Sequence, residues 1–217
     1  MKSLLISFLV LTSINSLLFA QNNNDFYKGT IFKTDGSKIN AKIQVPERGE
    51  QKKVSFYEGD VKKEISSEEV KSIEVISTNG LTYYFDRVNS IQNLKKQKIS
   101  KDKYLLLAIV KSEKGSAYIT PSKYVTTKDG NIATEYVYPQ GADIPTFNYY
   151  LRKKGEQNAS FLGMTTSGNN LMGINGVLKK QAKYLLKDNE ELLSKILNGE
   201  LKHSDLPLIV STYLEAE

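Results

Sequence analysis

The only histidine in this 217-residue sequence, His203, is followed directly by Ser204 and Asp205, the residue types of a Ser-His-acid catalytic triad. A triad brings its three side chains together from separate points of the chain, whereas adjacent side chains at a helix start point apart. We therefore interpret His203 as a solvent-facing loop residue and assign no catalytic residue.

Few residues of the sequence are suited to hold a metal ion or a cofactor. With no cysteine and one histidine, a zinc or copper site is not expected, and no glycine-rich phosphate loop follows a predicted strand. We assign no metal site and no cofactor. Any two of the 24 acidic residues can converge in space, so a hydrolase with paired carboxylates remains open as an alternative.

Tyrosine is the one abundant residue with special chemistry, at 13 copies. Strand tyrosines can form a recognition face, but tyrosine also suits a half-buried strand position with a wet hydroxyl, and we favour that structural interpretation. The tyrosines in or beside predicted strands are Tyr83, Tyr84, Tyr104, Tyr118, Tyr124, Tyr136, Tyr138, Tyr149 and Tyr150.

The N-terminal segment has the layout of a secretory signal peptide. Lys2 supplies the positive end, residues 4–11 an apolar run, and Ser16 to Ala20 a small-residue cleavage context. The run is too short for a membrane span, so we expect cleavage after Ala20 and no transmembrane span in the mature chain. Without cysteine, the mature chain has neither a disulfide nor a thiol for a lipid anchor. We expect export to the periplasm, or association with the outer membrane or cell surface.

The charge pattern argues against a nucleic-acid partner. The formal net charge is +6, and the excess is almost all lysine, since the only arginines are Arg48, Arg87 and Arg152. Nucleic-acid readout favours the planar guanidinium of arginine over the lysine ammonium. The densest basic stretch, from Lys95 to Lys103, we interpret as a solvated connection rather than a contact with anionic lipid or polysaccharide.

From Phe26 to Lys153 the sequence alternates short β-rich runs with turn dipeptides. Dipeptides of this kind between alternating apolar residues are typical of β-hairpins. The predicted hairpin turns are Asp35-Gly36, Gly59-Asp60, Asn79-Gly80 and Asp129-Gly130.

Two segments within this region differ from the alternating pattern. Ser66 with Glu69 predicts a capping box and one helical turn. The nearly continuous apolar run from Tyr104 to Val110 predicts a strand in the middle of a sheet, covered on both faces.

After the strands the composition becomes glycine-rich and then helical. Residues 154–176 contain Gly155, Gly163, Gly168, Gly173 and Gly176, which predicts a linker or mobile loop. From residue 177 onwards apolar residues recur at helical spacing, which predicts consecutive short amphipathic helices.

Two capping signals divide this C-terminal segment. Asp188 with Glu191 predicts the start of a second helix that ends at Gly199. Ser204 or Asp205 can cap a third helix, with Pro207 in its first turn. Such short helices are marginal alone, so we expect their apolar faces to cover the central strand.

These patterns together predict an α+β protein. We divide it into a signal peptide at 1–20, a β-rich domain at 21–153, a glycine-rich linker at 154–176 and a helical segment at 177–217. The β-rich domain is expected to be mostly antiparallel, a roll or sandwich of hairpins, with two or three short helices packed on the sheet.

The order of the segments resembles uncharacterised exported proteins common in Bacteroidota, in which a β-rich module precedes a short helical segment. The resemblance implies an envelope module and supplies no catalytic residues. The segments that carry it are "KGTIFKTDGSKINAKI", "EISSEEVKSIEV", "YLLLAIVKSEKGSAYIT" and "LLKDNEELLSKILNGELKHSDLPLIVSTYL".

We therefore expect an exported cell-envelope module, non-enzymatic, that binds a protein or glycan of the envelope through a β-face or the glycine-rich segment. Two alternatives stay open. One is a hydrolase of envelope polymers that uses carboxylates, and the other is a carrier of a small apolar ligand, which requires an empty interior cavity.

Overall fold

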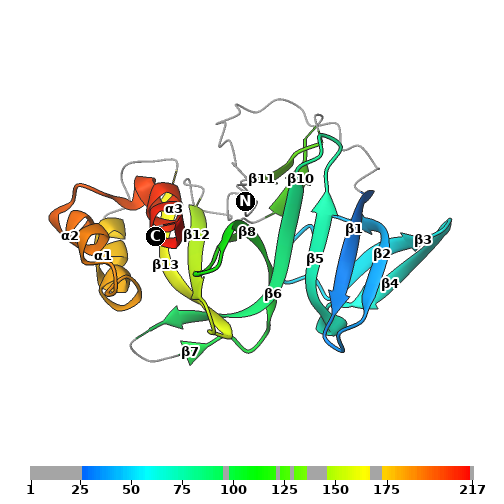
Figure 1. Ribbon diagram of the computed structural model, residues 1–217, viewed down its shortest axis with the longest axis horizontal. Helices are drawn as coiled ribbons and strands as arrows, with labels where there is room; N and C mark the ends of the chain where they lie inside the picture. The colour runs from blue at the N-terminus through cyan, green and yellow to red at the C-terminus, as the bar shows by residue number, and fades with distance from the viewer. Residues whose placement is uncertain are drawn as a thin grey trace, which may run out of the picture.

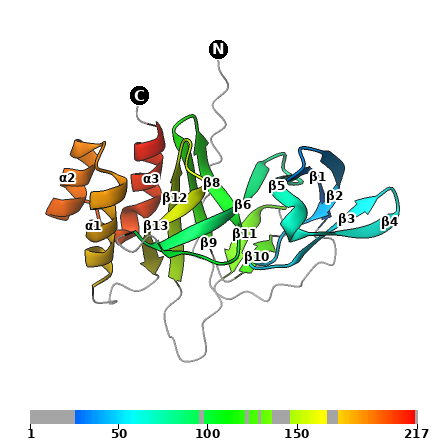
Figure 2. The same cartoon turned by 90° about the horizontal axis from the view of Figure 1, so that it is seen from below.

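The computed structural model describes residues 26–94, 98–120, 123–127, 130–135, 146–166 and 173–215. The predicted signal peptide, residues 95–97 of the lysine-rich stretch, Tyr136 and Tyr138 lie outside these ranges. The described chain is elongated, with helices at one end and a β-hairpin at the other (Figures 1 and 2). Mostly antiparallel strands are followed by helices, which confirms the predicted α+β class.

Eleven strands of the described chain form one sheet in the order β13-β12-β9-β8-β6-β5-β1-β2-β3-β4, with β7 beside β6. Strands β10 and β11 form a separate pair. The bounds are β1 Phe26–Lys33, β2 Lys38–Gln44, β3 Lys53–Glu58, β4 Val61–Ser66, β5 Val70–Ile76, β6 Thr82–Asn93, β7 Lys98–Ile99, β8 Tyr104–Ser112, β9 Gly115–Thr120, β10 Lys123–Thr126, β11 Ile132–Glu135, β12 Thr146–Lys153 and β13 Asn158–Thr166.

The predicted hairpins are confirmed as β1–β2, β3–β4, β5–β6 and β10–β11. At the first turn Gly36 adopts a φ of 88°, a left-handed conformation that favours glycine. The backbone N–H and the hydroxyl of Ser37 donate to the Asp35 carboxylate, and with Lys33 they lower the pKa of Asp35 to about 2. The Ser66 hydroxyl caps a single 3₁₀ turn, Ser67–Glu69, by accepting the Glu68 backbone N–H, which confirms the predicted helical turn.

Five strands of the sheet, β6, β8, β9, β12 and β13, close into a ring. The long strand β6 pairs with β5 and β8 along its first part, and its Asn89 and Ile91 pair with Asn158 and Ser160 of β13. Successive antiparallel strands alternate in direction, so the first and last of five run the same way. The closing β6–β13 pair is accordingly parallel.

The interior of the ring is packed with side chains from all five strands. Tyr118 is fully buried, and the rings of Tyr150 and Phe161 meet edge to face with centroids 5.7 Å apart. The other buried members are Val88, Leu106, Ala108 and Ala159.

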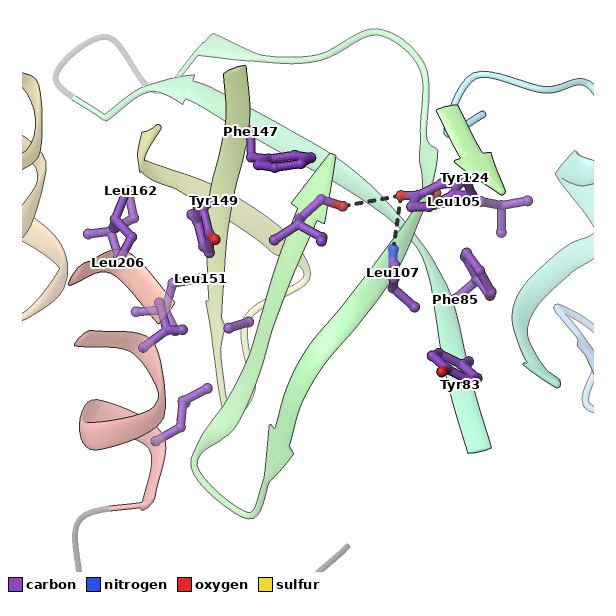
Figure 3. Close-up of a cluster of buried hydrophobic side chains, with 14 of the residues drawn as sticks. Tyr83, Phe85, Leu105, Leu107, Tyr124, Phe147, Tyr149, Leu151, Leu162 and Leu206 are labelled. Carbon is purple, nitrogen blue, oxygen red and sulfur yellow. Dashed lines mark hydrogen bonds between the residues drawn. The ribbon is translucent and has the colours of Figure 1, made fainter. Parts of the chain in front are cut away.

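The outside of the ring is covered by the C-terminal helices, α1 (Ile174–Leu185), α2 (Glu190–Asn198) and α3 (Leu206–Glu215). Helix α3 packs against β8 and β9, and α1 packs against β13. Figure 3 shows Leu206 of α3 beside Leu162 of β13, in the cluster that also contains Leu105 and Leu107 of β8. The predicted stripe of α3 is entirely buried: Leu206, Ile209, Val210, Tyr213 and Leu214. The expectation that helices cover the central strand is confirmed.

The predicted linker at 154–176 is wrong for residues 158–166, which form β13. This strand obtains backbone partners from β12 and β6, which the glycine content of the segment did not reveal. Gly163 allows a helix to approach closely, since a Cβ there would lie 3.2 Å from Leu206 Cδ1. Residues 167–172 lie outside the described ranges.

The predicted cap of the second helix is also displaced by one residue. The side chain of Asn189, not of Asp188, accepts a hydrogen bond from the backbone of Leu192. Asp188 instead lies 2.9 Å from Lys153 Nζ of β12 and accepts a hydrogen bond from the Tyr213 hydroxyl of α3. It therefore joins the helical segment to the ring.

Candidate functional site

The structure places His203 differently from the sequence-based interpretation. His203 is only 8% exposed, so the expectation of a solvent-facing side chain is wrong. Asn175 of α1 explains the burial, because its Oδ1 accepts the His203 backbone N–H at 2.9 Å and lies 3.0 Å from Nδ1. Ser204 is exposed to solvent while His203 is buried, so the two do not form a nucleophile pair.

The strand tyrosines serve mainly as core residues. Tyr83, Tyr118, Tyr124, Tyr149 and Tyr150 are buried, and Tyr84 and Tyr104 are partly buried. The Tyr124 hydroxyl accepts the Leu107 backbone N–H at 3.1 Å and donates to the Ile119 carbonyl at 3.1 Å (Figure 3). Burial raises the pKa of Tyr124 well above its usual range. The burial of five of these tyrosines agrees with the structural interpretation.

A charged cluster that the sequence did not reveal lies on the concave side of the ring. Asp86 of β6 accepts hydrogen bonds from Tyr118 of β9 and from Arg152 Nη2 of β12, each at 2.7 Å. Lys111 Nζ of β8 lies 3.2 Å from the same carboxylate. Burial and the Asp86 charge together raise the pKa of Tyr118 above its usual range. Because Tyr118, Arg152 and Lys111 all contact the Asp86 carboxylate, we interpret the cluster as a link between the strands of the ring and not as a reactive site.

Two features are absent from the described ranges. These ranges contain no group of three or more histidine, aspartate or glutamate side chains placed to hold a metal ion. No helix among the described residues is long and apolar enough to cross a bilayer.

A surface pocket of about 690 Å³ lies where β2 and β3 separate. The two strands pair at Lys42–Tyr57 and Ile43–Phe56, and beyond these pairs they diverge. Its lining is almost wholly polar and combines amides, carboxylates, cations and a hydroxyl: Gln44, Val45, Glu47, Arg48, Glu50, Gln51, Lys53 and Ser55.

The loop that closes this pocket, residues 45–52, is fixed to the rest of the fold by backbone bonds. The Glu47 carbonyl accepts the Tyr124 N–H at 2.8 Å, and the Gly49 carbonyl accepts the Leu105 N–H at 2.9 Å. Inside the loop, the Gln51 side chain accepts the Glu47 N–H and donates to the Lys53 carbonyl. The pocket walls are therefore pre-formed, which lowers the entropy cost of binding.

An aromatic pair lies beside the pocket on the same face of the sheet. Phe26 pairs with Gln44 across β1 and β2, and its ring meets the Tyr57 ring at a centroid distance of 4.7 Å. Lys62 Nζ of β4 lies over the Phe26 ring, 5.5 Å from its centroid. A partly exposed aromatic surface thus adjoins a polar pocket. We call the pocket and this pair the β2–β3 site.

The sequence did not predict the β2–β3 site, because none of its residues belongs to a recognisable binding motif. The stretch "VPERGEQKK" from Val45 to Lys53 reads as a polar loop. The loop between β2 and β3, residues 45–52, is longer than the connections 34–37, 59–60 and 77–81 of the neighbouring hairpins, and this length was the available signal. Phe26 lies at the very start of the first strand, and its approach to Tyr57 depends on the three-dimensional pairing.

Comparison of the chain with protein-family models, curated proteins and solved structures finds no match. The functional argument therefore rests on the geometry of the β2–β3 site.

Proposed function

We propose that this protein is an exported, non-enzymatic module of the cell envelope that binds a glycan through the β2–β3 site. The sequence supports export, through the signal-like segment that ends at Ala20. Of the two surfaces expected to bind, the β-face is favoured, because much of the glycine-rich segment is strand β13, built into the ring.

The observation that carries the proposal is a pre-formed polar pocket beside an aromatic pair. Sugar hydroxyls both donate and accept hydrogen bonds, and the pocket supplies both kinds of partner in Gln44, Arg48, Glu50 and Ser55. Sugars also present apolar C–H faces, which suit an aromatic surface such as that of Phe26. The size and polarity of the pocket fit a short saccharide segment better than a protein interface with an apolar centre.

We favour binding over hydrolysis because both glutamates of the pocket, Glu47 and Glu50, are exposed to solvent. A general acid in glycoside cleavage is usually desolvated, since burial keeps the carboxyl protonated near neutral pH. No such environment surrounds these two residues.

The test is glycan binding by the mature chain from Gln21, measured on immobilised envelope polysaccharides and then by calorimetry in solution. The double variant Arg48→Gln with Glu50→Gln removes two charged partners while leaving the Gln51 bonds of the loop intact. Each hydrogen bond from a charged group is worth roughly 1.5–3 kcal/mol, so we expect affinity to fall by about tenfold or more.

The matched control is Lys180→Gln with Glu215→Gln, which makes the same charge changes on exposed residues of α1 and α3. We expect the control to bind as the wild type does. Failure of every envelope glycan to bind, or equal binding by both double variants, would refute the proposal. New reducing ends that disappear in Glu50→Gln would establish the hydrolase alternative instead.

A further inference from the structure

A row of basic side chains crosses the outer face of the N-terminal sheet next to the β2–β3 site. By outer face we mean the side of β1–β4 opposite the buried residues Ile31 and Ile43. The strand register places Lys28 of β1 opposite Lys42 of β2, Lys42 opposite Tyr57 of β3, and Tyr57 opposite Lys62 of β4. We call Lys28, Lys42 and Lys62 the lysine row.

All three side chains of the lysine row point away from the core. Side chains alternate along a strand, and the neighbours Ile43 and Phe56 are buried. Lys28, Lys42 and Lys62 are exposed. The row therefore lies on the same side of the sheet as Tyr57.

The pairing of Lys28 with Lys42 works against stability, because like charges directly opposite on neighbouring strands repel. Among the described residues, no carboxylate lies within 4.0 Å of the Nζ atom of either lysine. Other lysines of this region do have such partners, for example Lys53 with Glu64 at 2.7 Å and Lys63 with Glu58. A negatively charged ligand bound at this face would reduce the repulsion between Lys28 and Lys42, and this reduction would add to the free energy of binding.

We infer that the lysine row, together with the β2–β3 site, binds an anionic polysaccharide that runs across the strands from β1 to β4. This inference rests on the proposed function and specifies the ligand as a glycan that carries carboxylate or phosphate groups. Neighbouring strands lie about 4.8 Å apart, so the row presents positive charges along a line that a repeating polyanion can follow. Tyr57, between Lys42 and Lys62, supplies a ring for a sugar face.

The positions of the pocket and of the lysine row along β2, β3 and β4 indicate where each part of the ligand would lie. Gln44 and Ser55 of the pocket flank Lys42 and Tyr57 by two residues along β2 and β3, so one saccharide unit in the pocket lies beside the row. Lys62, held over the Phe26 ring, lies at the β4 end of the row. The pocket then forms hydrogen bonds with the hydroxyl groups of one saccharide unit, and the lysine row neutralises the anionic groups of the next units along the ligand.

The experiment uses the mature chain with polygalacturonate as an anionic glycan and dextran as a neutral one. The double variant Lys28→Gln with Lys42→Gln removes the repelling pair, and Lys180→Gln with Lys183→Gln makes the same charge change on exposed positions of α1. We expect polygalacturonate affinity to fall at least tenfold in the first variant, with a weaker dependence on salt, and to stay unchanged in the second.

A second readout separates binding from folding. Relief of the repulsion should leave the melting temperature of Lys28→Gln with Lys42→Gln equal to that of the wild type or raise it by about 1–3 °C. Weaker binding by a protein of undiminished stability then identifies the lysines as ligand contacts. A marked fall in melting temperature would overturn the premise that the pair is unfavourable.

The outcomes distinguish this inference from the proposed function. Polygalacturonate binding that is lost in Arg48→Gln with Glu50→Gln but unchanged in Lys28→Gln with Lys42→Gln refutes the lysine row as the anion site and leaves the pocket in place. Equal polygalacturonate binding by all variants refutes both. Preference for vesicles of anionic phospholipid over polygalacturonate, dependent on Lys28 and Lys42, would overturn the glycan as the occupant of the row.

Discussion

Replacement of Asp86 by asparagine tests whether the five strands close as the structure shows. Asp86 of β6 meets Arg152 of β12, 66 residues later, only because the ring brings two non-adjacent strands face to face. Asparagine keeps the size of the side chain and an acceptor for the Tyr118 hydroxyl. It removes the charge that balances Arg152 and Lys111.

The expected loss follows from the burial of the cluster. Removal of one partner of a fully buried ion pair costs about 3–5 kcal/mol. The side chains of Arg152 and Lys111 are 26% and 39% exposed, so both cations regain some hydration in the variant. We therefore expect the free energy of unfolding to fall by about 2–3 kcal/mol. With a urea m-value of about 2–3 kcal/mol/M, the midpoint falls by about 1 M.

Urea unfolding followed by far-ultraviolet circular dichroism gives this midpoint, since the chain lacks tryptophan. Asp60→Asn is the matched control, because Asp60 is exposed in the β3–β4 turn and undergoes the same change. A double-mutant cycle with Arg152→Gln should give a coupling of about 1–2 kcal/mol. A midpoint for Asp86→Asn within about 0.3 M of the control midpoint would contradict this prediction. Absence of coupling between Asp86 and Arg152 would likewise show that their ion pair does not stabilise the closed ring.

Two further predictions concern the core and the helical segment. Tyr124→Phe leaves the buried Leu107 N–H without its partner, so stability at pH 7 should fall by about 1–3 kcal/mol. Burial raises the pKa of Tyr124 in the folded state, so its contribution is present below the unfolded value of about 10 and is lost as pH rises above it. The stability difference between wild type and variant should thus shrink by about 1.4 kcal/mol per pH unit above pH 10, and a constant difference from pH 8 to 11.5 would contradict this. Truncation after Asn175 removes most of α1 and all of α2 and α3, which exposes the apolar face of β8, and should yield insoluble or molten protein. A truncated chain that is monomeric by sedimentation and melts cooperatively would show that the helices are dispensable for folding.

Local chemistry accounts for much of the fold. The hairpin turns, the Ser66 cap and the stripe of α3 each depend on residues within a few positions of one another. Turn conformation, capping and periodicity are short-range effects, so the sequence suffices to predict these elements and the α+β class.

The errors share a physical cause, which is that burial and pairing come from distant parts of the chain. Gly163 looked like part of a linker, but β6 and β12 supply the backbone partners that make its segment a strand. His203 looked solvent-facing, but Asn175, 28 residues earlier, binds it against α1. Neither partner is visible in the local pattern.

The candidate site shows the same division. The sequence alone predicted export and a β-rich chain, and it showed an excess of lysine, no cysteine and a single histidine. The divergence of β2 from β3, the contact of Phe26 with Tyr57 and the register that opposes Lys28 to Lys42 were decided by tertiary structure. Register sets which side chains face each other across strands, and a shift of one residue would turn every one of them to the opposite face. The sequence therefore determined which side chains the protein has, and the pairing of strands in the folded sheet determined which of these side chains are in contact.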